Sequence, residues 1–452
     1  MNKRSIAFVG GQWGDEGKAK ILTWVLRFMR NDLYSNLDLF EKDTEKVKRI
    51  LTQRFQGGGN AGHTAKTGGR KYAFHQVPSG IVYSGTYNLM GEGMFVNPRE
   101  LLNEIRALMR KGLRISPDNL GVATNAQVTL DYHVEDDQAD FNQEEHSSTG
   151  KGIKETAEDR AGRKGMRFIE FLDADLMAKI LRDTHFPDGY VVTTLPGERE
   201  PTTLTVEEYA HSYDVERFFL APYTVDETRI VNDPTFLYHA FEGAQSLRLG
   251  LNHGAVPGTS SSDPDLVPHR PDIIMGIFKA YESSVGIALR YFVGEMDTEL
   301  ADAVRATLGE FGTTTGKPRH IGWFDVVNAR YSIAAAQMDF LSLTKLDAME
   351  IFAEVGSPVK VVTDYNIDGQ VSREWLDYFH RRDTLKSAVP VHEVLDSWDR
   401  TVERDGHTLT PPAKRYVQCL EDHLKKHFSI IGIGPADDEV IVRENPIEVF
   451  YS

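Results

Sequence analysis

The stretch from Ser5 to Lys20, SIAFVGGQWGDEGKAK, constrains the fold of this chain more than any other part of it. Its first residues, Ser5 to Val9, form a short apolar run of the kind found in buried parallel strands. Glycines follow, and from Lys18 to Arg30 apolar side chains recur at helical spacing. A strand, a glycine-rich turn and a helix present backbone N–H groups and a positive helix end to an anion. The stretch therefore predicts a phosphate-binding turn at the edge of a sheet.

This turn differs from the P-loop motif at two positions. Gln12 stands where the motif has glycine, and Ala19 stands where it has the Ser or Thr that binds Mg²⁺. Asp15 and Glu16 add two carboxylates, which repel phosphate unless one of them binds a metal ion or handles a proton. A tight βα turn with solvated charges remains the alternative.

Other segments alternate between strand-like and helical patterns. Residues 98–111 predict an amphipathic helix that Asn97 caps and Pro98 begins. Strand-like runs occupy residues 121–130, 190–195, 340–343, 359–362 and 430–433, whereas the polar residues 134–165 are expected to be the longest irregular stretch. The alternation favours an α/β fold with a central, mostly parallel sheet flanked by helices, and a ligand at the sheet's carboxyl edge. Because no Pro/Ser-rich linker interrupts the chain, we expect one large domain over residues 1–452.

Composition excludes several classes of protein. The net charge of −16 argues against a general duplex-binding surface, although a local basic pocket for a mononucleotide remains compatible with it. The single cysteine, Cys419, excludes an intramolecular disulfide framework and a Cys-rich zinc site, and its helical context predicts a small core residue. The sequence contains no run of eighteen apolar residues, so no membrane span is expected, and the N-terminus lacks the apolar region of a signal peptide. We expect a soluble, cytoplasmic protein.

Three further loops combine glycines with groups that bind anions. Residues 56–64, QGGGNAGHT, place the Asn60 amide and the His63 imidazole close together. Residues 147–164, SSTGKGIKETAEDRAGRK, offer hydroxyls, N–H groups and cations to a phosphate. Residues 312–323, GTTTGKPRHIGW, can bind a dicarboxylate through threonine hydroxyls and bidentate arginine. On composition alone, the 147–164 loop is better explained as a flexible solvated loop, and a lone loop histidine such as His63 is more often a surface or capping residue.

Taken together, these motifs resemble those of adenylosuccinate synthetases, ligases that join aspartate to a 6-oxopurine nucleotide at the expense of a nucleoside triphosphate. The resemblance begins with QWGDEGK and continues through GGGNAGHT, the 147–164 loop, FEGAQ at residues 241–245, the 312–323 loop and LTKLD at residues 343–347. It implies that family's large α/β domain. It also implies a mechanism in which the purine 6-oxygen is first phosphorylated and is then displaced by the amino group of aspartate.

The resemblance assigns roles to individual residues. Catalysis would fall to Asp15, His63 and Gln245, with Asp15 as the base that takes the N1 proton and His63 as the acid near the bridging oxygen. Mg²⁺ would bind Asp15 and the carbonyl of Gly62, which are hard oxygen donors. The triphosphate would contact Gly14, Glu16, Gly17, Lys18, Gly62, Thr64, Lys345, Asp347 and Gly434. The purine nucleotide would contact Asn60, Ser148, Thr149, Arg163, Gln245, Ser260 and Lys317, and L-aspartate would contact Thr314, Thr315, Lys317 and Arg319.

The same resemblance implies a homodimer, because in the family the arginine matching Arg163 reaches into the site of the other subunit. Asp347 could accept hydrogen bonds from the N1–H and 2-amino groups of a guanine, although an Asp after a strand is also a common helix N-cap. Gly432 stands where the family usually has serine in the loop that closes over this base. GTP, ATP and dATP all remain candidate phosphate donors.

Departures from the family pattern lie where the acceptor nucleotide is expected. They are residues 154–157 (KETA), residues 287–291 (IALRY), Gly59 and Lys317. Lys317 replaces an arginine near the ribose 2′-hydroxyl, which favours dGMP, the substrate of a phage branch that makes 2-aminoadenine for modified DNA. IMP, the ordinary substrate, remains the alternative, since Asp15 is retained here and some phage-branch members lack it. A non-catalytic GTP-binding sensor is a third hypothesis, and dependence of phosphate release on L-aspartate would exclude it.

Overall fold

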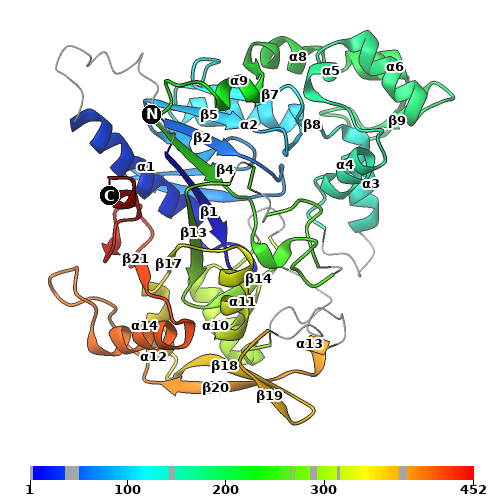
Figure 1. The fold of residues 1–452 in the computed structure, drawn as a ribbon. Coiled ribbons are helices and arrows are strands. Elements are labelled where there is room, and N and C mark those ends of the chain that lie inside the picture. Colours follow the sequence, from blue (N-terminus) through cyan, green and yellow to red (C-terminus); the bar gives the residue numbers. More distant parts are fainter. Residues whose placement is uncertain are drawn as a thin grey trace.

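A ten-stranded sheet runs through the protein in the computed structural model, which describes residues 4–35, 50–141, 148–256, 258–264, 267–268, 270–285, 293–312, 316–375 and 384–451 (Figure 1). Neighbouring strands pair in parallel except at one edge, where β22 runs antiparallel to β21. The expected mostly parallel sheet is therefore confirmed. Its strands are, in spatial order, β11 (Thr224–Val225), β7 (Leu120–Ala123), β5 (Thr86–Met90), β2 (Ile50–Arg54), β12 (Tyr238–Glu242), β1 (Arg4–Gly10), β13 (Ile273–Lys279), β17 (Phe340–Thr344), β21 (Phe428–Gly432) and β22 (Val440–Val442).

Strand β1 lies in the middle of this sheet, between β12 and β13. Its side chains alternate between the two faces: Ile6 and Phe8 pack in one apolar cluster, and Ala7 and Val9 in another. Because both faces are covered, this strand is apolar throughout. Helix α1 (Lys18–Ser35) covers the first face, and the opposite face packs against α10 (Thr298–Leu308), α11 (Val326–Ala335) and α14 (Pro411–Leu424).

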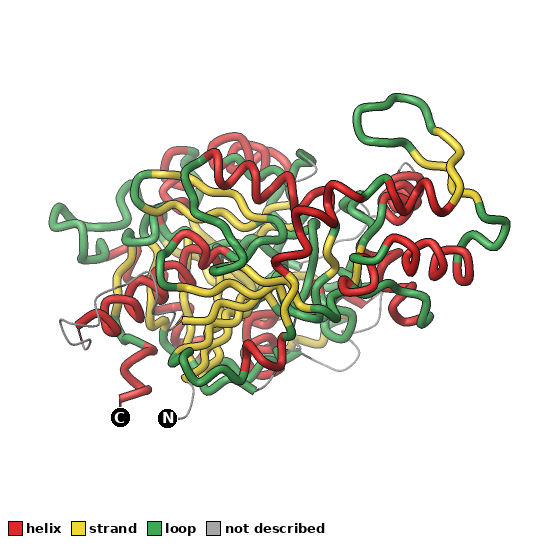
Figure 2. Tube along the Cα trace, turned by 90° about the horizontal axis from the view of Figure 1, so that it is seen from above, coloured by secondary structure: helices red, strands yellow, loops and turns green. Residues whose placement is uncertain are grey.

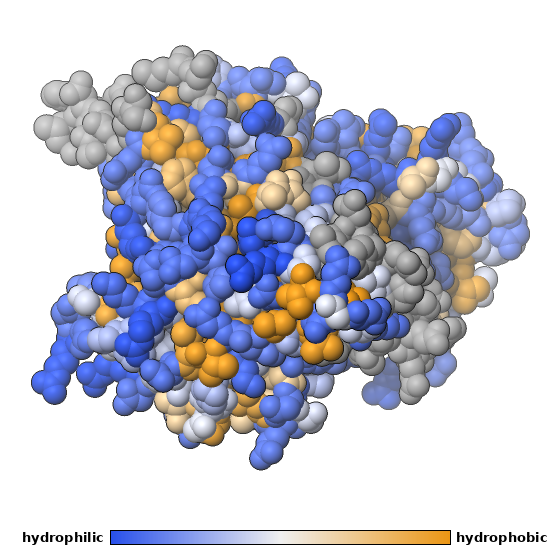
Figure 3. Space-filling model, turned by 60° about the horizontal axis from the view of Figure 1, so that its bottom comes forward, coloured by the Kyte–Doolittle hydropathy of each residue, from blue (hydrophilic) through white to orange (hydrophobic). Residues whose placement is uncertain are grey.

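A smaller mixed sheet lies beyond these helices, at the bottom of Figure 1. It consists of β16 (Phe324–Asp325), β18 (Val359–Ile367), β19 (Gln370–Ser372) and β20 (Val389–Leu395), near α12 (Ile351–Glu354) and α13 (Thr384–Ser387). Strand β20 exposes several valines. Figure 3, which brings this end forward, shows apolar side chains in separate patches on a largely hydrophilic surface.

A helical part extends from the opposite end of the large sheet, as the view from above shows (Figure 2). It contains α3 (Asp131–Phe141), α4 (Ile153–Ala161), α5 (Phe168–Phe171), α6 (Ala174–Thr184), α7 (Val206–His211), α8 (Asp214–Leu220) and the hairpin of β9 (Tyr190–Thr193) and β10 (Thr202–Thr205). The remaining elements lie nearer the sheet: α2 (Pro98–Arg110), α9 (Glu227–Val231), the hairpins β3 (His63–Thr67) with β4 (Arg70–Phe74) and β14 (Glu282–Ser284) with β15 (His320–Gly322), and the pair β6 (Phe95–Val96) with β8 (Gln127–Val128).

Two local predictions were wrong. Residues 121–130 do not form one strand, because the chain turns after Ala123 and β8 leaves the large sheet to pair with β6. Residues 134–165 are not mainly irregular, since they complete α3 and contain α4. These two helices are polar and pack against each other, so the apolar periodicity that marks other helices is weak there.

Other local predictions are confirmed. Asn97 caps α2 by accepting a hydrogen bond from the Glu100 backbone N–H at 3.1 Å, with Pro98 as the first helical residue. Cys419 is buried in α14. Among the described residues, no helix combines the length and the apolar character that crossing a membrane requires.

Candidate functional site

The carboxyl ends of the central strands open onto one pocket of about 930 Å³. Loops far apart in the sequence meet there, because parallel strands bring their carboxyl ends to a common edge. Thr314 and Thr315 lie outside the described residues. The predicted residues that line the pocket are Gly14, Asp15, Gly17, Lys18, Asn60, Gly62, His63, Thr64, Ser148, Thr149, Gln245, Ser260, Lys317, Arg319, Lys345, Asp347 and Gly434.

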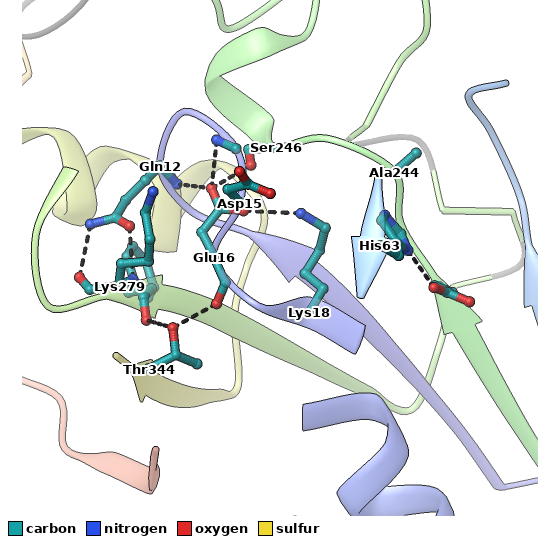
Figure 4. A network of polar contacts seen from close by, with 12 residues as sticks. Gln12, Asp15, Glu16, Lys18, His63, Ala244, Ser246, Lys279 and Thr344 are labelled. Carbon is teal, nitrogen blue, oxygen red and sulfur yellow. Dashed lines mark hydrogen bonds and ion pairs between the residues drawn. The ribbon is translucent and has the colours of Figure 1, made fainter. Parts of the chain in front are cut away.

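Glu16 differs from its neighbours, because its side chain points beneath the turn instead of into the pocket. It is fully buried, accepts hydrogen bonds from the Gly14 backbone N–H at 2.9 Å and the Ser246 hydroxyl, and pairs with the Lys18 ammonium at 2.9 Å (Figure 4). Burial alone would raise the pKa of Glu16, but the charge of Lys18 holds it below its ordinary value. This carboxylate therefore shapes the turn and holds Lys18, and the predicted contact of Glu16 with a triphosphate stays a prediction.

Gln12 joins the same turn to the neighbouring strand. Its side-chain amide donates to the Lys279 carbonyl at 3.1 Å and accepts from the Lys279 N–H at 2.8 Å (Figure 4). These two bonds imitate those that a paired strand would make to the backbone of β13. Thr344, at the end of β17, donates its hydroxyl to the Glu16 carbonyl at 2.6 Å. The turn is thus fixed from two strands.

A charged cluster connects the turn with the 312–323 loop. Arg319 pairs with the Asp15 carboxylate and with Glu310, whose Oε2 lies 2.5 Å from the Arg319 Nη1. Lys345 donates to the other oxygen of Glu310 at 2.8 Å. Burial alone would raise the pKa of Glu310, but the surrounding cations, Lys345 first, hold it well below its usual range. Burial lowers the pKa of the nearby Lys279 to about 8, against the opposing charge of Glu310.

His63 stands at the start of β3 and lines the pocket, near Lys18 (Figure 4). Its Nδ1 is hydrogen-bonded to Glu242, the last residue of β12. Burial lowers the pKa of His63, and this outweighs the opposing effect of Glu242. The lowered pKa favours the neutral form of this imidazole.

The loop at residues 148–154 is organised by acidic side chains. Ser148 donates its hydroxyl to Asp137, which also accepts from the Gly152 N–H at 2.8 Å. Lys151 pairs with Glu100. A Cβ at Gly59 would lie 2.5 Å from Oε2 of Glu100, so glycine at this position leaves room for that carboxylate.

Asp347 lies at the other end of the pocket, beside the C-terminal loop. Its Oδ1 is buried and accepts no hydrogen bond from the residues that the structure describes. Lys20 donates to the Gly434 carbonyl and, at 2.9 Å, to that of Glu439, which ties this loop to α1. A Cβ at Gly432 would come within 3.2 Å of the Lys20 Nζ, which accounts for glycine there. The pocket thus contains a buried carboxylate oxygen ready to accept a hydrogen bond from a ligand.

Backbone strain marks several predicted residues. Asp15, Arg163, Gln245 and Lys345 all have φ between 56° and 60°, where non-glycine residues are uncommon and cost about 1 kcal/mol or more. Three of them line the pocket, whereas Arg163 is exposed on the loop after α4 and is not among the described lining residues. Strain of this kind is concentrated where side chains must be aimed at a ligand.

Sequence reasoning missed several buried partners of the site. Gln12 was noted only as a departure from a motif, and Glu242 only as a letter of FEGAQ, while Glu310 and Lys279 were not singled out. The available signal was a charged residue at the end of an apolar strand, as in Lys279 and Glu242, because burying such a group requires partners.

Comparisons with known proteins agree with this geometry. The family model described as adenylosuccinate synthetase matches residues 7–441. The adenylosuccinate synthetase of Caldanaerobacter subterraneus subsp. tengcongensis is 32% identical over 470 residues, covering 97% of this chain and 98% of its own. That of Synechococcus sp. (strain CC9311) is 33% identical over 464 residues, covering 98% and 97%.

Two solved structures share the fold. Fully ligated adenylosuccinate synthetase from Plasmodium falciparum aligns with a TM-score of 0.76 and 23% identity, covering 97% of this chain and 99% of its own. Succinoaminodeoxyadenylate synthetase from cyanophage S-2L, bound to dGMP and dATP, aligns with a TM-score of 0.56 and 19% identity, covering 100% and 98%.

Proposed function

This chain belongs to the adenylosuccinate synthetase family of C–N ligases, which join aspartate to a purine nucleotide, and we propose that its pocket does so through a 6-phosphoryl nucleotide. The observation that carries the proposal is the meeting of Asp15, His63 and Arg319 in one pocket. A base, an acid and a dicarboxylate-binding cation at one place are what the two steps require.

In the first step, the Asp15 carboxylate takes the proton from N1 of the purine. The 6-oxygen then attacks the γ-phosphorus, and the bond from that phosphorus to the β,γ-bridging oxygen breaks, which releases the nucleoside diphosphate. Lys18 and His63 lie where they can stabilise charge on the transferred group and the leaving oxygen. Glu16 keeps the Lys18 ammonium in place through their 2.9 Å contact.

In the second step, the amino nitrogen of L-aspartate attacks C6, and phosphate leaves with the 6-oxygen. Arg319 would bind a carboxylate of aspartate through its planar fork, assisted by Lys317 and by Thr314 and Thr315. Arg319 pairs with the Asp15 carboxylate, so bound aspartate would compete for this guanidinium. Gln245 would contact the purine, while Asn60, Ser148, Thr149 and Ser260 would contact the nucleotide.

The donor atoms of the site suit Mg²⁺. The Asp15 carboxylate, whose side chain is 32% exposed, and the chain at Gly62 both border the pocket, and Mg²⁺ prefers such hard oxygen donors. When bound, the ion supplies positive charge that neutralises the triphosphate.

We propose GTP as the phosphate donor, with ATP and dATP as the alternatives. The buried Oδ1 of Asp347 favours a base that donates hydrogen bonds, and guanine offers both N1–H and its 2-amino group to one carboxylate. The turn at Gly14, Gly17 and Thr64 would contact the phosphates, and Lys345 and Gly434 would lie beside the base.

For the acceptor we propose dGMP. Lys317 is half-buried on the pocket wall and offers a single ammonium in place of a planar guanidinium, which suits a sugar without a 2′-hydroxyl. IMP is the second candidate, because the relatives named above are adenylosuccinate synthetases over nearly their whole length and Asp15 is retained. Replacing Lys317 with arginine should improve the use of IMP and GMP relative to dGMP, and an unchanged ratio would remove this argument.

We also propose that the whole chain works as one catalytic unit in a cytoplasmic homodimer. The exposed position and strained φ of Arg163 support a role in the partner's site, where it would bind the nucleotide phosphate.

The deciding experiment is phosphate release in the presence of Mg²⁺, with IMP, GMP and dGMP each crossed against GTP, ATP and dATP. We expect turnover only when L-aspartate is present, and the highest kcat/KM with dGMP and GTP. Release without aspartate would favour the GTP-binding sensor instead. Turnover with IMP alone would make the protein an enzyme of AMP synthesis.

The role of Asp15 has a separate test. Asp15→Ala should lower kcat by about 10²–10⁴, the range for losing a general base, while the triphosphate still binds. A near-normal kcat would remove Asp15 from the base role.

A further inference from the structure

We propose that Glu242 is a positioning residue that orients His63 by accepting the Nδ1–H of its ring, so that Nε2 serves the pocket. The inference goes beyond the reaction proposed above and rests on the catalytic role that it gives to His63. Glu242 itself is not among the described residues that line the pocket, so it acts through the histidine.

The first support is the way the carboxylate is held. Glu242 is fully buried, and each of its oxygens has one partner: Oε1 contacts Nδ1 of His63, and Oε2 accepts from the Ser79 backbone N–H at 2.8 Å. Rotation of the carboxylate would break one of these contacts. The acceptor is therefore fixed in place and not merely near the ring.

The second support is where Glu242 stands in the fold. It is the last residue of β12, paired in register with Phe8 of β1 on one side and with Arg54 of β2 on the other. A side chain on a central strand is held more rigidly than one on a loop. His63, by contrast, follows the glycine-rich residues 57–62, which alone would leave its ring poorly fixed.

The third support is the charge around the pair. Arg54 is fully buried beside Glu242, and its Nη1 donates to the His75 carbonyl. Its Nε and Nη2 are buried without a hydrogen-bond partner among the residues that the structure describes. Burial alone would raise the pKa of Glu242, but the contact with His63 first, and then the charge of Arg54, hold it below its ordinary value. Glu242 is therefore an anion, that is, an acceptor only.

The chemical consequence follows from the two nitrogens of imidazole. With Nδ1–H donated to Glu242, Nε2 is the nitrogen left to face the triphosphate, in a fixed ring plane. Nε2 can act as an acid only when the ring carries a second proton, and the Glu242 anion stabilises the imidazolium that then forms. Glutamine at position 242 keeps the shape but can offer N–H to Nδ1, which reverses the preferred tautomer. Loss of the correct tautomer is costly in other carboxylate–histidine pairs even when the geometry survives.

The test compares Glu242→Gln with wild type in aspartate-dependent phosphate release. We expect kcat to fall about 10- to 100-fold, the range for removing such an orienting partner, with KM for GTP and for L-aspartate within about twofold of wild type. Glu227→Gln is the matched control, because Glu227 is also buried, accepts from Gln53 and from the Glu92 N–H, and is not among the described residues that line the pocket. Its kcat should be unchanged.

A double mutant separates positioning from a general structural effect. If Glu242 acts through the histidine, adding Glu242→Gln to His63→Asn should lower kcat no further than His63→Asn alone. A further loss of the full 10-fold or more would overturn the proposal, as would a KM increase with unchanged kcat in the single variant.

Nitrogen-15 NMR of histidine-labelled wild-type protein provides a readout that does not depend on catalytic activity. The His63 signals, assigned by their absence in His63→Asn, should report a neutral ring protonated at Nδ1. Protonation at Nε2 instead would overturn the positioning role. Inactivity of wild type with every acceptor would refute the proposed function while leaving this measurement valid.

Discussion

Glu310 is the anion shared by the cations of the charged cluster, so neutralising it is the most informative perturbation. The carboxylate is 1% exposed and lies 2.5 Å from the Arg319 guanidinium and 2.8 Å from the Lys345 ammonium. It also accepts from the Tyr281 hydroxyl, and Lys279 lies close enough to influence its pKa. Glu310→Gln keeps the shape and leaves these cations without their common anion.

The expected cost follows from burial. Removing one partner of a buried ion pair costs about 3–5 kcal/mol, because the remaining charge stays out of water uncompensated. The Lys345 side chain is 35% exposed, so water screens its charge and reduces its contribution to this cost. Lys279, with a pKa of about 8, can lose its proton once Glu310 is neutral and so relieve the repulsion. We therefore expect Glu310→Gln to lower the free energy of unfolding by about 3 kcal/mol at pH 7, the lower end of that range.

Urea unfolding at pH 7, followed by far-UV circular dichroism, measures this change, and the slope with urea should be unaltered. Adding Lys279→Met to Glu310→Gln should restore about 1 kcal/mol, because it removes one of the cations left unpaired. A loss below about 1 kcal/mol in the single variant would refute the charge argument. A double variant less stable than the single would refute it equally.

Three further outcomes are expected. Lys279 and Lys20 both have a pKa lowered to about 8 by burial, so the folded state releases these protons while the unfolded state still holds them. Stability should therefore rise by about 2 kcal/mol between pH 7.5 and 9, with about half of the rise lost in Lys279→Met; a flat profile would contradict this. Gly432→Ser, whose Cβ would press on Lys20, should lower the free energy of unfolding by about 1 kcal/mol, measured with urea, and an unchanged midpoint would exclude this crowding. Arg163→Ala co-expressed with Asp15→Ala should recover about a quarter of wild-type turnover, from one intact site in each mixed dimer, and no recovery would argue against a shared site.

Much of the central sheet was predictable because its signals are local. Ser5–Val9, Phe340–Leu343 and Ile430–Ile433 are apolar runs that parallel strands bury on both faces, and each coincides with β1, β17 or β21 to within two residues at either end. The glycine-rich turn after β1 could likewise be placed at the carboxyl edge, because it directly follows such a strand. The loops at residues 147–164 and 312–323 follow the helices α3 and α10 instead. The helices over residues 134–165 were not predicted, because their stability comes from packing on each other and not from an apolar stripe.

The buried partners of the site were not predictable from local pattern. His63 and Glu242 are 179 residues apart in the sequence, and Lys345 and Glu310 are 35 apart. In the sequence, a carboxylate beside a glycine indicates a solvated turn. Only the fold shows that a distant cation or imidazole contacts it. The resemblance to a family supplied many of the residues that line the pocket, but not the buried residues that hold them in place.

Gln12 shows why a departure from a motif can carry structural information. A P-loop has glycine there, and its absence made the first turn a weaker match. In the structure, the Gln12 amide makes two hydrogen bonds to the backbone of Lys279, at 3.1 and 2.8 Å, just beyond the point where β1 ends. Glycine could make neither bond. Gln12, which weakened the motif match, is therefore the residue that joins the glycine-rich turn after β1 to β13. The same contact fixes the backbone of Lys279, whose ammonium lies near Glu310, and thereby connects the turn to the charged cluster on which the first prediction rests.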